Sequence, residues 1–445
     1  MLEAWRATRY IGACEGLLRG HSWSRKQLVA FQRRRLRALV RHAYERVPYY
    51  RRLMEQAAVK PADIRSLADL SRIPLTSRAD VQALPVDQIV ARGFDPRKLV
   101  EHRTSGSTGE PLSVRQTRLE GLVSRLYQLR LLFGLGLRLT DRGANVVLYR
   151  PEYKRRWYRR LGLLPNEAIH CLLPAEEILS ELRRIKPDIL GGYTGSLSWL
   201  AGQLTQEDRI RIRPRFIPVG AEMLTSEMRR QISEGFGAPV YDFYSSHELS
   251  SIAWECARTG RYHICEPLVI GEILRDGRPV APGETGEFVG TVLDSYAMPF
   301  IRYRQGDLVT RGETPCPCGA PYATITQIQG RVADRFQLPD GRSLHPYSLV
   351  GPLVLEAPWV RRYQIVQERL DRIAIKLVPV GEPPVDAAAA VARRMAAELG
   401  GNVQVEARLV KEIPPDPNGK FRPYYSLVSR SAPPGSASAV PRAVP

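Results

Sequence analysis

Residues 103–112 read Arg-Thr-Ser-Gly-Ser-Thr-Gly-Glu-Pro-Leu, and their types suit the binding of a polyphosphate. Glycine lets consecutive backbone N–H groups turn toward one point and form a concave anion site, and the hydroxyls add further donors. This is not a Walker A loop, because no Gly-Lys-Ser/Thr follows the glycines. A flexible Ser/Gly linker is the alternative. The candidate phosphate-binding residues are Thr104, Ser105, Gly106, Ser107, Thr108 and Gly109.

Cysteine and histidine cluster in one third of the chain, in a pattern that suits a structural metal. Three thiolates and one imidazole make a tetrahedral zinc set. The Cys-x-Cys spacing is tighter than the usual Cys-x₂-Cys, and Cys265 competes with His263 as a ligand. Reduced, partly buried cysteines are the alternative interpretation. The predicted ligands are Cys256, His263, Cys316 and Cys318.

Strands that alternate with helices are expected to position these groups. Apolar strand-like runs at 145–149, 188–193, 216–220 and 240–244 alternate with helical patterns at 119–137, 196–204 and 226–235. Such alternation predicts a mainly parallel sheet covered by helices on both faces. Ligands bind beyond the carboxyl ends of parallel strands. The segments after Val219 and Tyr244 are therefore the expected site.

The character of the chain changes after this region. Residues 286–293 and 299–304 are typical of antiparallel strands, and Gly330-Arg331 is expected to be a hinge before a small α+β unit. We predict an N-terminal domain at 1–330, a mobile C-terminal domain at 331–428 and a disordered Ser, Ala, Pro and Gly-rich tail at 429–445.

The bulk properties limit the class of protein. A chain of 445 residues exceeds the size of one hydrophobic core. It has no long apolar run and no signal-peptide pattern at its start, so we expect a cytoplasmic protein without membrane insertion. The net charge of +19 favours anionic ligands. The basic groups at 33–35 and 154–156 are interpreted as solvated helix faces, and no nucleic-acid partner is expected.

Six motifs stand in a specific order along the chain. Residues 105–109 come first, followed by Gly220-Ala221-Glu222 and then by residues 244–248, Tyr-Ser-Ser-His-Glu. The later motifs are residues 302–307, Arg-Tyr-Arg-Gln-Gly-Asp, then Gly330-Arg331, and residues 417–422, Pro-Asn-Gly-Lys-Phe-Arg. This series resembles the adenylate-forming superfamily, and more narrowly the phenylacetate–CoA ligase family with its capsule-biosynthesis-like branch.

The resemblance implies a fold and a reaction. It implies a large adenylation domain with parallel sheets flanked by helices and a small mobile C-terminal domain. The family binds ATP and a carboxylic acid, forms an acyl-adenylate and releases pyrophosphate, and many members transfer the acyl group to CoA. Mg²⁺ is the implied cofactor, and zinc is consistent with similar cysteine pairs in the family. A carrier protein is another possible acceptor.

The resemblance also implies roles for single residues. Residues 104–109 would hold the β- and γ-phosphates, Lys420 would contact the α-phosphate and the acid, and Glu248 would help to place Mg²⁺. Asp307 would accept hydrogen bonds from the ribose. Further implied nucleotide contacts come from Gly220, Ala221, Glu222, Asp242, Phe243, Tyr244 and Arg331. Taken singly, Asp307 could instead initiate a turn, Glu248 could lie at a helix N-terminus and Lys420 could be a solvated hairpin residue.

The chain departs from the family pattern at several points. Ser245 stands where the family has glycine, and His247 takes the position of a hydroxyl, from which it could donate to the α-phosphate. Tyr193 and Ser245 are the expected walls of the acid pocket. Ala333 replaces the usual acidic hinge residue, and the loop expected to line the CoA tunnel carries Pro339.

These departures predict robust adenylation and weak or absent CoA thioester formation. A full acid–CoA ligase is the alternative, and a non-catalytic nucleotide-binding protein of polysaccharide biosynthesis is a third hypothesis.

Overall fold

The computed structural model describes residues 14–20, 22–103, 112–148, 162–331, 336–344, 346, 359–379, 381–416 and 421–428. Contacts divide the chain into two compact units. The larger unit comprises Met1–Val332 and Pro415–Phe421, and the smaller comprises Ala333–Pro414 and Arg422–Pro445. Among the described residues, none of the helices is both long and apolar enough for a membrane span.

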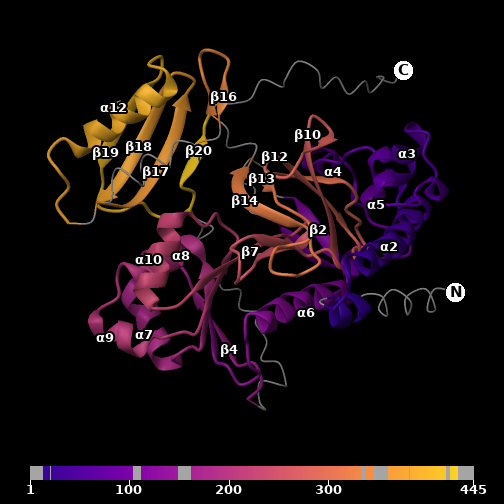
Figure 1. The fold of residues 1–445 in the computed structure, drawn as a ribbon, viewed down its shortest axis with the longest axis horizontal. Coiled ribbons are helices and arrows are strands. Elements are labelled where there is room, and N and C mark those ends of the chain that lie inside the picture. Colours follow the sequence, from indigo (N-terminus) through magenta and orange to yellow (C-terminus); the bar gives the residue numbers. More distant parts are fainter. Residues whose placement is uncertain are drawn as a thin grey trace. The chain divides into compact units, whose positions relative to one another are not determined.

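A 12-stranded sheet organises the larger unit (Figure 1). Its strands follow the order β11-β10-β12-β13-β14-β9-β8-β7-β6-β5-β3-β4. Their bounds are β3 Gly143–Val147, β4 Asn166–His170, β5 Ile189–Tyr193, β6 Ile217–Gly220, β7 Val240–Ser246, β8 Ser250–Glu255, β9 Tyr262–Ile264, β10 Val269–Arg275, β11 Arg278–Pro279, β12 Thr285–Val292, β13 Tyr303–Arg311 and β14 Thr324–Arg331.

Parallel pairing joins β4, β3, β5, β6 and β7, as the alternating pattern predicts. Buried side chains from three helices pack in one core with these strands: α7 (Ala175–Ile185), α8 (Thr194–Ala201) and α10 (Ser226–Phe236). The short α9 spans Gln206–Arg211. In α10, Met228, Ile232 and Phe236 recur at helical spacing and are buried, so one stripe of the helix faces the core. The sequence therefore predicts this half of the sheet well.

The strands from β7 to β11 pair antiparallel, so the sheet is mixed rather than mainly parallel. The expected strand at 299–304 begins only at Tyr303. The reason is Arg302, whose φ of 48° lies in the left-handed region. Its guanidinium is buried, forms two hydrogen bonds to Glu272 and donates to the carbonyl oxygens of Ser71 and Ile73.

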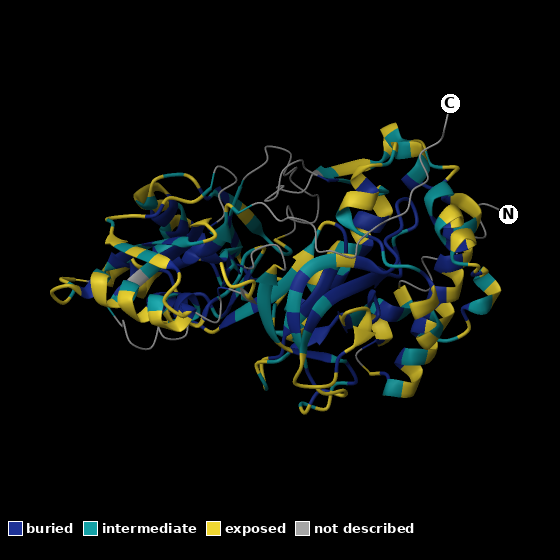
Figure 2. Ribbon diagram, turned by 90° about the horizontal axis from the view of Figure 1, so that it is seen from above, coloured by how far each residue is buried: buried dark blue, intermediate teal, exposed yellow. Residues whose placement is uncertain are grey.

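Helices near the N-terminus form another part of this unit. Ser24 caps α2 (Arg25–Arg46) in a capping box with Gln27, and Pro48 starts α3 (Pro48–Gln56). Figure 2 shows exposed residues on the helices near the N-terminus. Shorter elements follow, as the repeated prolines predict: 3-10 helices at Pro61–Asp63, Ala68–Arg72 and Pro96–Lys98, α4 Arg78–Gln82 and α5 Val86–Ile89.

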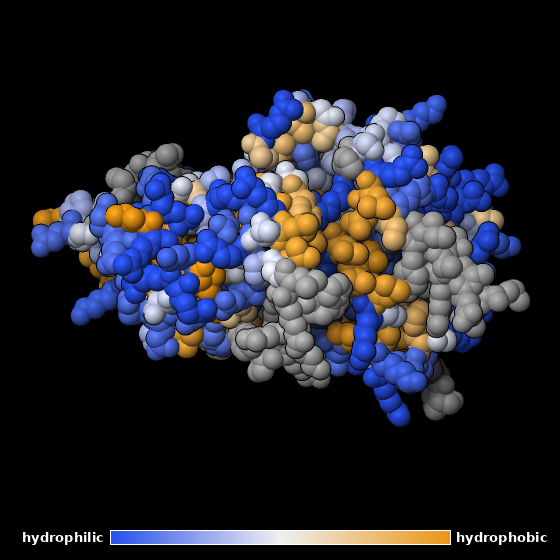
Figure 3. All heavy atoms as spheres, turned by 90° about the horizontal axis from the view of Figure 1, so that it is seen from below, coloured by the Kyte–Doolittle hydropathy of each residue, from blue (hydrophilic) through white to orange (hydrophobic). Residues whose placement is uncertain are grey.

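Two paired strands flank the predicted phosphate-binding segment. The ends of β1 (Val100–Arg103) and β2 (Ser113–Gln116) meet, with Arg103 opposite Ser113. The long helix α6 (Arg118–Gly134) follows and exposes Leu119, Leu122 and Phe133. Figure 3 shows hydrophobic residues side by side with hydrophilic ones on one face of the molecule.

The smaller unit is an α+β structure, as expected. Its sheet has the order β19-β18-β17-β20, and helix α12 accompanies it. The bounds are β17 Val360–Arg369, β18 Arg372–Pro379, α12 Ala387–Leu399, β19 Gln404–Leu409 and β20 Tyr424–Ser426, with a hairpin of β15 Phe336–Gln337 and β16 Ser343–Leu344.

Candidate active site

The carboxyl ends of β5, β6 and β7 lie side by side. Tyr193 pairs with Gly220, and Gly220 pairs with Phe243. A Cβ on Gly220 would lie 2.7 Å from the carbonyl oxygen of Phe243, so only glycine lets the two strands approach this closely. The next residue, Ala221, has a φ of 66°, which turns the chain sharply away from the sheet. This is the edge at which ligands bind in parallel sheets.

Glu222 stabilises the beginning of α8. Its Oε2 accepts a hydrogen bond of 2.6 Å from the backbone N–H of Gly195. A carboxylate is favourable at this end of a helix, because the first backbone N–H groups lack partners and the helix dipole is positive there. Glu222 thus fixes the turn after β6 to the helix that follows Tyr193.

Asp242 lies in a buried polar cluster within β7. Its carboxylate accepts a hydrogen bond from the Tyr262 hydroxyl at 2.8 Å, and its backbone N–H donates to Glu255 at 3.0 Å. Arg229 forms an ion pair with Glu255 at 2.8 Å. Burial raises the pKa of Asp242 to about 7. The carboxylate of this predicted nucleotide contact therefore accepts a hydrogen bond from Tyr262 of β9, which lies two places from β7 in the sheet.

Tyr244 and Asp307 bring two distant motifs together. The Tyr244 hydroxyl donates to Asp307 Oδ2 at 2.6 Å. Arg331 pairs with Asp307 in the β13–β14 register, and its Nε lies 3.8 Å from Asp307 Oδ1. Burial raises the pKa of Asp307, while Arg331 and the Tyr244 hydroxyl act in the opposite direction. Asp307 belongs to a strand, so its interpretation as a turn-initiating residue is wrong.

Glu248 lies in the turn between β7 and β8, so its alternative placement at a helix N-terminus is wrong. It is buried, and its Oε1 accepts a hydrogen bond from Tyr303 at 3.3 Å and lies 3.7 Å from Arg78. Its Oε2 accepts no hydrogen bond within the described part of the chain. Tyr303 and Arg78 therefore hold one oxygen of this carboxylate in place.

The two departures from the family motif are both exposed. Ser245 lies at the end of β7, and the ring of His247 stacks on His102 with centroids 5.4 Å apart and planes at 11°. His102 belongs to β1 and lies 2.6 Å from Gln116 of β2, between their Nε2 atoms. His247 therefore contacts the strand pair that flanks the predicted phosphate-binding segment.

Several predicted site residues lie outside the described part of the chain. These are Thr104, Ser105, Gly106, Ser107, Thr108, Gly109 and Lys420, together with the hinge positions Ala333 and Asp334 and the tail from 429 onward. The basic group at 154–156 is also outside it. Their roles stay predictions.

The predicted metal ligands converge on one point. The Sγ atoms of Cys256, Cys316 and Cys318 and a ring nitrogen of His263 lie within 4.8 Å of one another. Cys318 Sγ is 3.4 Å from His263 Nε2. With Zn–S bonds of about 2.3 Å and Zn–N bonds of about 2.0 Å, ligand atoms of a tetrahedral site lie about 3.5–3.8 Å apart. The geometry of the four residues fits a zinc ion.

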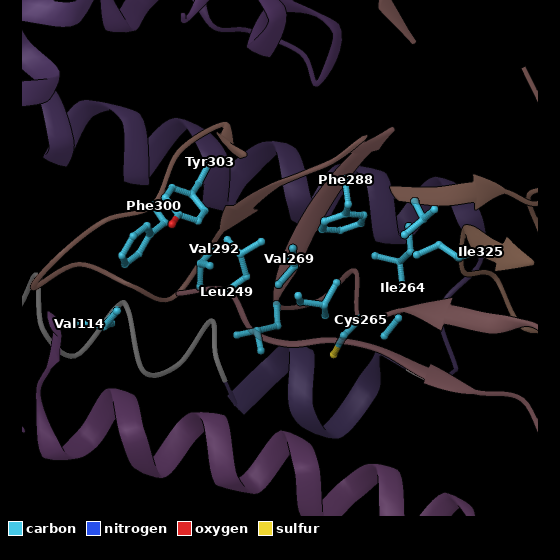
Figure 4. Packing of buried hydrophobic residues seen from close by; sticks show 14 of the residues in the cluster. Val114, Leu249, Ile264, Cys265, Val269, Phe288, Val292, Phe300, Tyr303 and Ile325 are labelled. Carbon is cyan, nitrogen blue, oxygen red and sulfur yellow. The ribbon is translucent and has the colours of Figure 1, made fainter. Parts of the chain in front are cut away.

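Burial and local turns support this cluster. Burial lowers the pKa of His263 to about 4, so its imidazole is neutral, the form that binds metals. Gly319 takes a φ of 94° and donates its N–H to the Cys316 carbonyl oxygen at 2.9 Å, which folds the Cys-x-Cys segment back on itself. Cys265, the competing ligand, is fully buried in the hydrophobic core beside Ile264 and Val269 (Figure 4). Among the described residues, the cluster of potential metal ligands contains His263 and not Cys265.

Curated relatives decide the family. The chain is 30% identical to a phenylacetate–coenzyme A ligase of Thermus thermophilus over 385 residues, which cover 81% of this chain and 83% of the relative. The chain belongs to the phenylacetate–CoA ligase family. A phenylacetate–coenzyme A ligase of Escherichia coli is also 30% identical, over 63% of this chain and 67% of that protein. The family predicted from the six ordered motifs is confirmed.

The fold and the C-terminal segment agree with this membership of the phenylacetate–CoA ligase family. Residues 341–425 match the CapK C-terminal domain family. A crystal structure of 2-hydroxyisobutyryl-CoA ligase in complex with 2-HIB-AMP superposes with a TM-score of 0.78 at 22% identity, over 92% of this chain and 91% of that chain. The predicted fold class is thereby confirmed.

Sequence reasoning missed three residues of the candidate site. Arg78 and Tyr303 hold Glu248, and His102 stacks on His247. Tyr303 belongs to the motif at 302–307, four residues before Asp307, so its position in the sequence could have indicated a place in the site. Arg78 lies far from any motif in the chain, and only the folded structure brings it to the site. His102 directly precedes the segment 103–112, so its place in the sequence was also a usable signal.

Proposed function

We propose that the protein activates a carboxylic acid by ATP-dependent adenylation. A carboxylate oxygen forms a bond to the α-phosphorus of ATP, the bond from that phosphorus to the β-phosphate bridging oxygen breaks, and pyrophosphate leaves. The observation that carries the proposal is the convergence of Tyr244, Glu248, Asp307 and Arg331 beside the carboxyl ends of β5 to β7. Membership of an AMP-forming ligase family supports it.

Two negative reactants must meet in this reaction, so cations and hydrogen-bond donors supply much of the catalysis. In the proposed site, Asp307 accepts hydrogen bonds from the ribose hydroxyls, and Arg331 and residues 104–109 hold the nucleotide. Lys420 contacts the α-phosphate and the acid. Glu248 helps to hold Mg²⁺, and its carboxylate, whose Oε2 accepts no hydrogen bond from a described residue, supports this role, because Mg²⁺ prefers carboxylate oxygens together with phosphate oxygens. Tyr193 and Ser245 are the proposed walls of the acid pocket.

We also propose one structural zinc ion, held by Cys256, His263, Cys316 and Cys318. Four protein ligands leave no open position, so the ion would serve stability rather than chemistry. It would join the turn after β8 to the segment after β13. We place the enzyme in the cytoplasm on the basis of its sequence.

CoA is the first candidate for the acyl acceptor, because the curated relatives are CoA ligases. The sequence instead predicts weak transfer to CoA, on the basis of Pro339. The loop forms a tight hairpin in which Gly341 takes a φ of 82° and donates to the Leu338 carbonyl oxygen at 3.0 Å. A glycine therefore does occupy this turn, which weakens the reason for expecting poor transfer. Another acceptor, such as a carrier protein, remains the alternative.

The test is product analysis by mass spectrometry with ATP, Mg²⁺ and a panel of aryl and alkyl acids, with CoA present or absent. AMP and pyrophosphate that depend on the acid support adenylation, and an acyl-CoA product identifies CoA as the acceptor. Acyl-AMP without acyl-CoA would point to another acceptor. No acid-dependent product with any acid would favour the non-catalytic, nucleotide-binding alternative.

A further inference from the structure

From the sequence, the arginines at 33–35 are interpreted as one solvated face of a helix. The structure corrects this, because the arginines of α2 have different surroundings. Arg35 is buried and pairs with Asp294, and Arg34 pairs with Glu15 at 2.5 Å. Arg33 belongs to a different set. With Arg37 and Arg41, it lies on the exposed side of α2, opposite the buried Leu36, Leu39, Val40 and Ala43.

These arginines line a pocket. Arg33, Arg37 and Arg41 follow one another at intervals of four residues, so their side chains form a row along one face of the helix, about 6 Å apart. The opposite wall comes from Pro61, Ala62 and Arg65, and the pocket has a volume of about 530 Å³. Ile64 is fully buried, which anchors this wall to the core.

The pocket carries positive charge that the described residues do not neutralise. Arg33, Arg37 and Arg41 form no ion pair with a carboxylate in the described part of the chain, unlike Arg34 and Arg35 beside them. The two carboxylates of the adjoining turns are engaged elsewhere. Asp63 accepts from the Lys60 N–H at 2.8 Å, and Asp69 accepts from the backbone of Arg65 and Ser66 at 3.0 and 2.8 Å. Like charges four residues apart destabilise a helix, so a bound anion would relieve this repulsion.

We infer that this arginine pocket binds a small polyphosphate, separately from the proposed active site. Guanidinium groups match phosphate oxygens with paired hydrogen bonds, and several guanidinium groups suit two or more phosphates. The volume lies in the range of small-molecule sites. None of the described residues that line the pocket is aromatic, so it would recognise phosphate groups rather than stack on a base. The diphosphate could be free pyrophosphate or part of a nucleotide or CoA.

Calorimetric titration of the full-length protein with inorganic pyrophosphate, without Mg²⁺, tests the site. The double variant Arg37→Gln/Arg41→Gln removes half of its charge, and Arg34→Gln is the matched control on the same helix outside the pocket. We expect the wild type and Arg34→Gln to show a binding event that weakens by at least about tenfold in the double variant. Pyrophosphate should raise the melting temperature of the wild type more than that of the double variant.

Parallel titrations with ATP, CoA and inorganic monophosphate at matched ionic strength identify the source of the phosphates. Binding of pyrophosphate, ATP or CoA that is tighter than that of monophosphate and weakens in the double variant supports the site, and the ligand whose affinity falls most in that variant names the source. Equal binding of monophosphate, or unchanged pyrophosphate affinity in the double variant, would overturn the inference. Adenylation should be unchanged in the double variant, and the binding result stands whether or not adenylation is detected.

Discussion

The hydrogen bond from Tyr244 to Asp307 joins residues 63 positions apart in the chain. The two strands are four places apart in the sheet order, which is about 19 Å in a flat sheet. The distance of 2.6 Å between the hydroxyl and the carboxylate therefore requires the antiparallel strands to curl back toward β7. Asp307 thereby reaches the edge at which a nucleotide would bind.

Removal of the Asp307 carboxylate tests its proposed contact with the ribose. We expect Asp307→Ala to weaken ATP binding by about tenfold or more, because hydrogen bonds to a charged group contribute about 1.5–3 kcal/mol. Asp87→Ala, on the exposed face of α5, is the control. ATP affinity measured by calorimetry at equal folded fractions decides the matter. Equal affinity for Asp307→Ala and wild type would remove Asp307 from the nucleotide site.

Asp242 makes stability depend on pH. Its pKa is raised to about 7, against 3.8 for the ordinary group, so between these values the folded protein binds a proton that the unfolded chain releases. The protonated Asp242 therefore contributes to the free energy of unfolding at low pH, and this contribution is lost as the pH rises through 7. From pH 5 to pH 8 the wild type should lose about 2–3 kcal/mol relative to Asp242→Asn. Urea unfolding of both proteins at the two pH values measures this, and parallel pH profiles would contradict it.

At the scale of the elements, Gly220 lets β6 and β7 pack closely because it has no Cβ. We expect Gly220→Ala to destabilise the fold by about 1–3 kcal/mol, because its Cβ would lie 2.7 Å from the rigid carbonyl oxygen of Phe243. Gly134→Ala at the end of α6 is the control, since its Cβ would meet nothing within 4 Å. Urea unfolding compares the two. Equal free energies of unfolding for Gly220→Ala and Gly134→Ala would mean that β6 and β7 accommodate the added Cβ without loss of stability.

The proposed zinc ion joins two turns of the larger unit, so its loss should affect metal content and stability together. Cys318→Ser is expected to lose the metal and to melt at a lower temperature, because binding of a structural metal contributes to folding free energy. Cys14→Ser, at an exposed position, is the control. Metal analysis after purification without chelators, followed by thermal unfolding, provides both readings. Protein free of zinc after zinc-supplemented expression would refute the site.

Local patterns predicted the elements on which the site rests better than they predicted the contacts between them. The strands before Tyr193, Gly220 and Phe243 follow from apolar runs with helices between them. The late start of β13 does not, because it depends on the ion pair between Arg302 and Glu272, thirty residues apart. The four metal ligands were predicted as a set, but the choice of His263 over Cys265 needed the packing of the core.

At the scale of the whole molecule, ordered motifs identified the family, which no single motif could do. Arg78, which supports Glu248, comes from outside those motifs, since a tertiary contact and not sequence spacing selects it. Lys420 lies in the last motif of the series, outside the described part of the chain. Its role in adenylation is the part of the proposal that rests most on the resemblance.

Acid-dependent ATP–pyrophosphate exchange tests the central claim most directly, because it detects reversible formation of an acyl-adenylate whatever the final acceptor. The wild type should catalyse exchange with at least one acid from an aryl and alkyl panel. Lys420→Ala should lose the exchange while binding ATP within a few-fold of the wild-type affinity, since the lysine would act mainly on charge that develops in the transition state. Exchange at the wild-type rate in Lys420→Ala would contradict the assignment of the lysine. Absence of exchange with every acid would contradict adenylation itself.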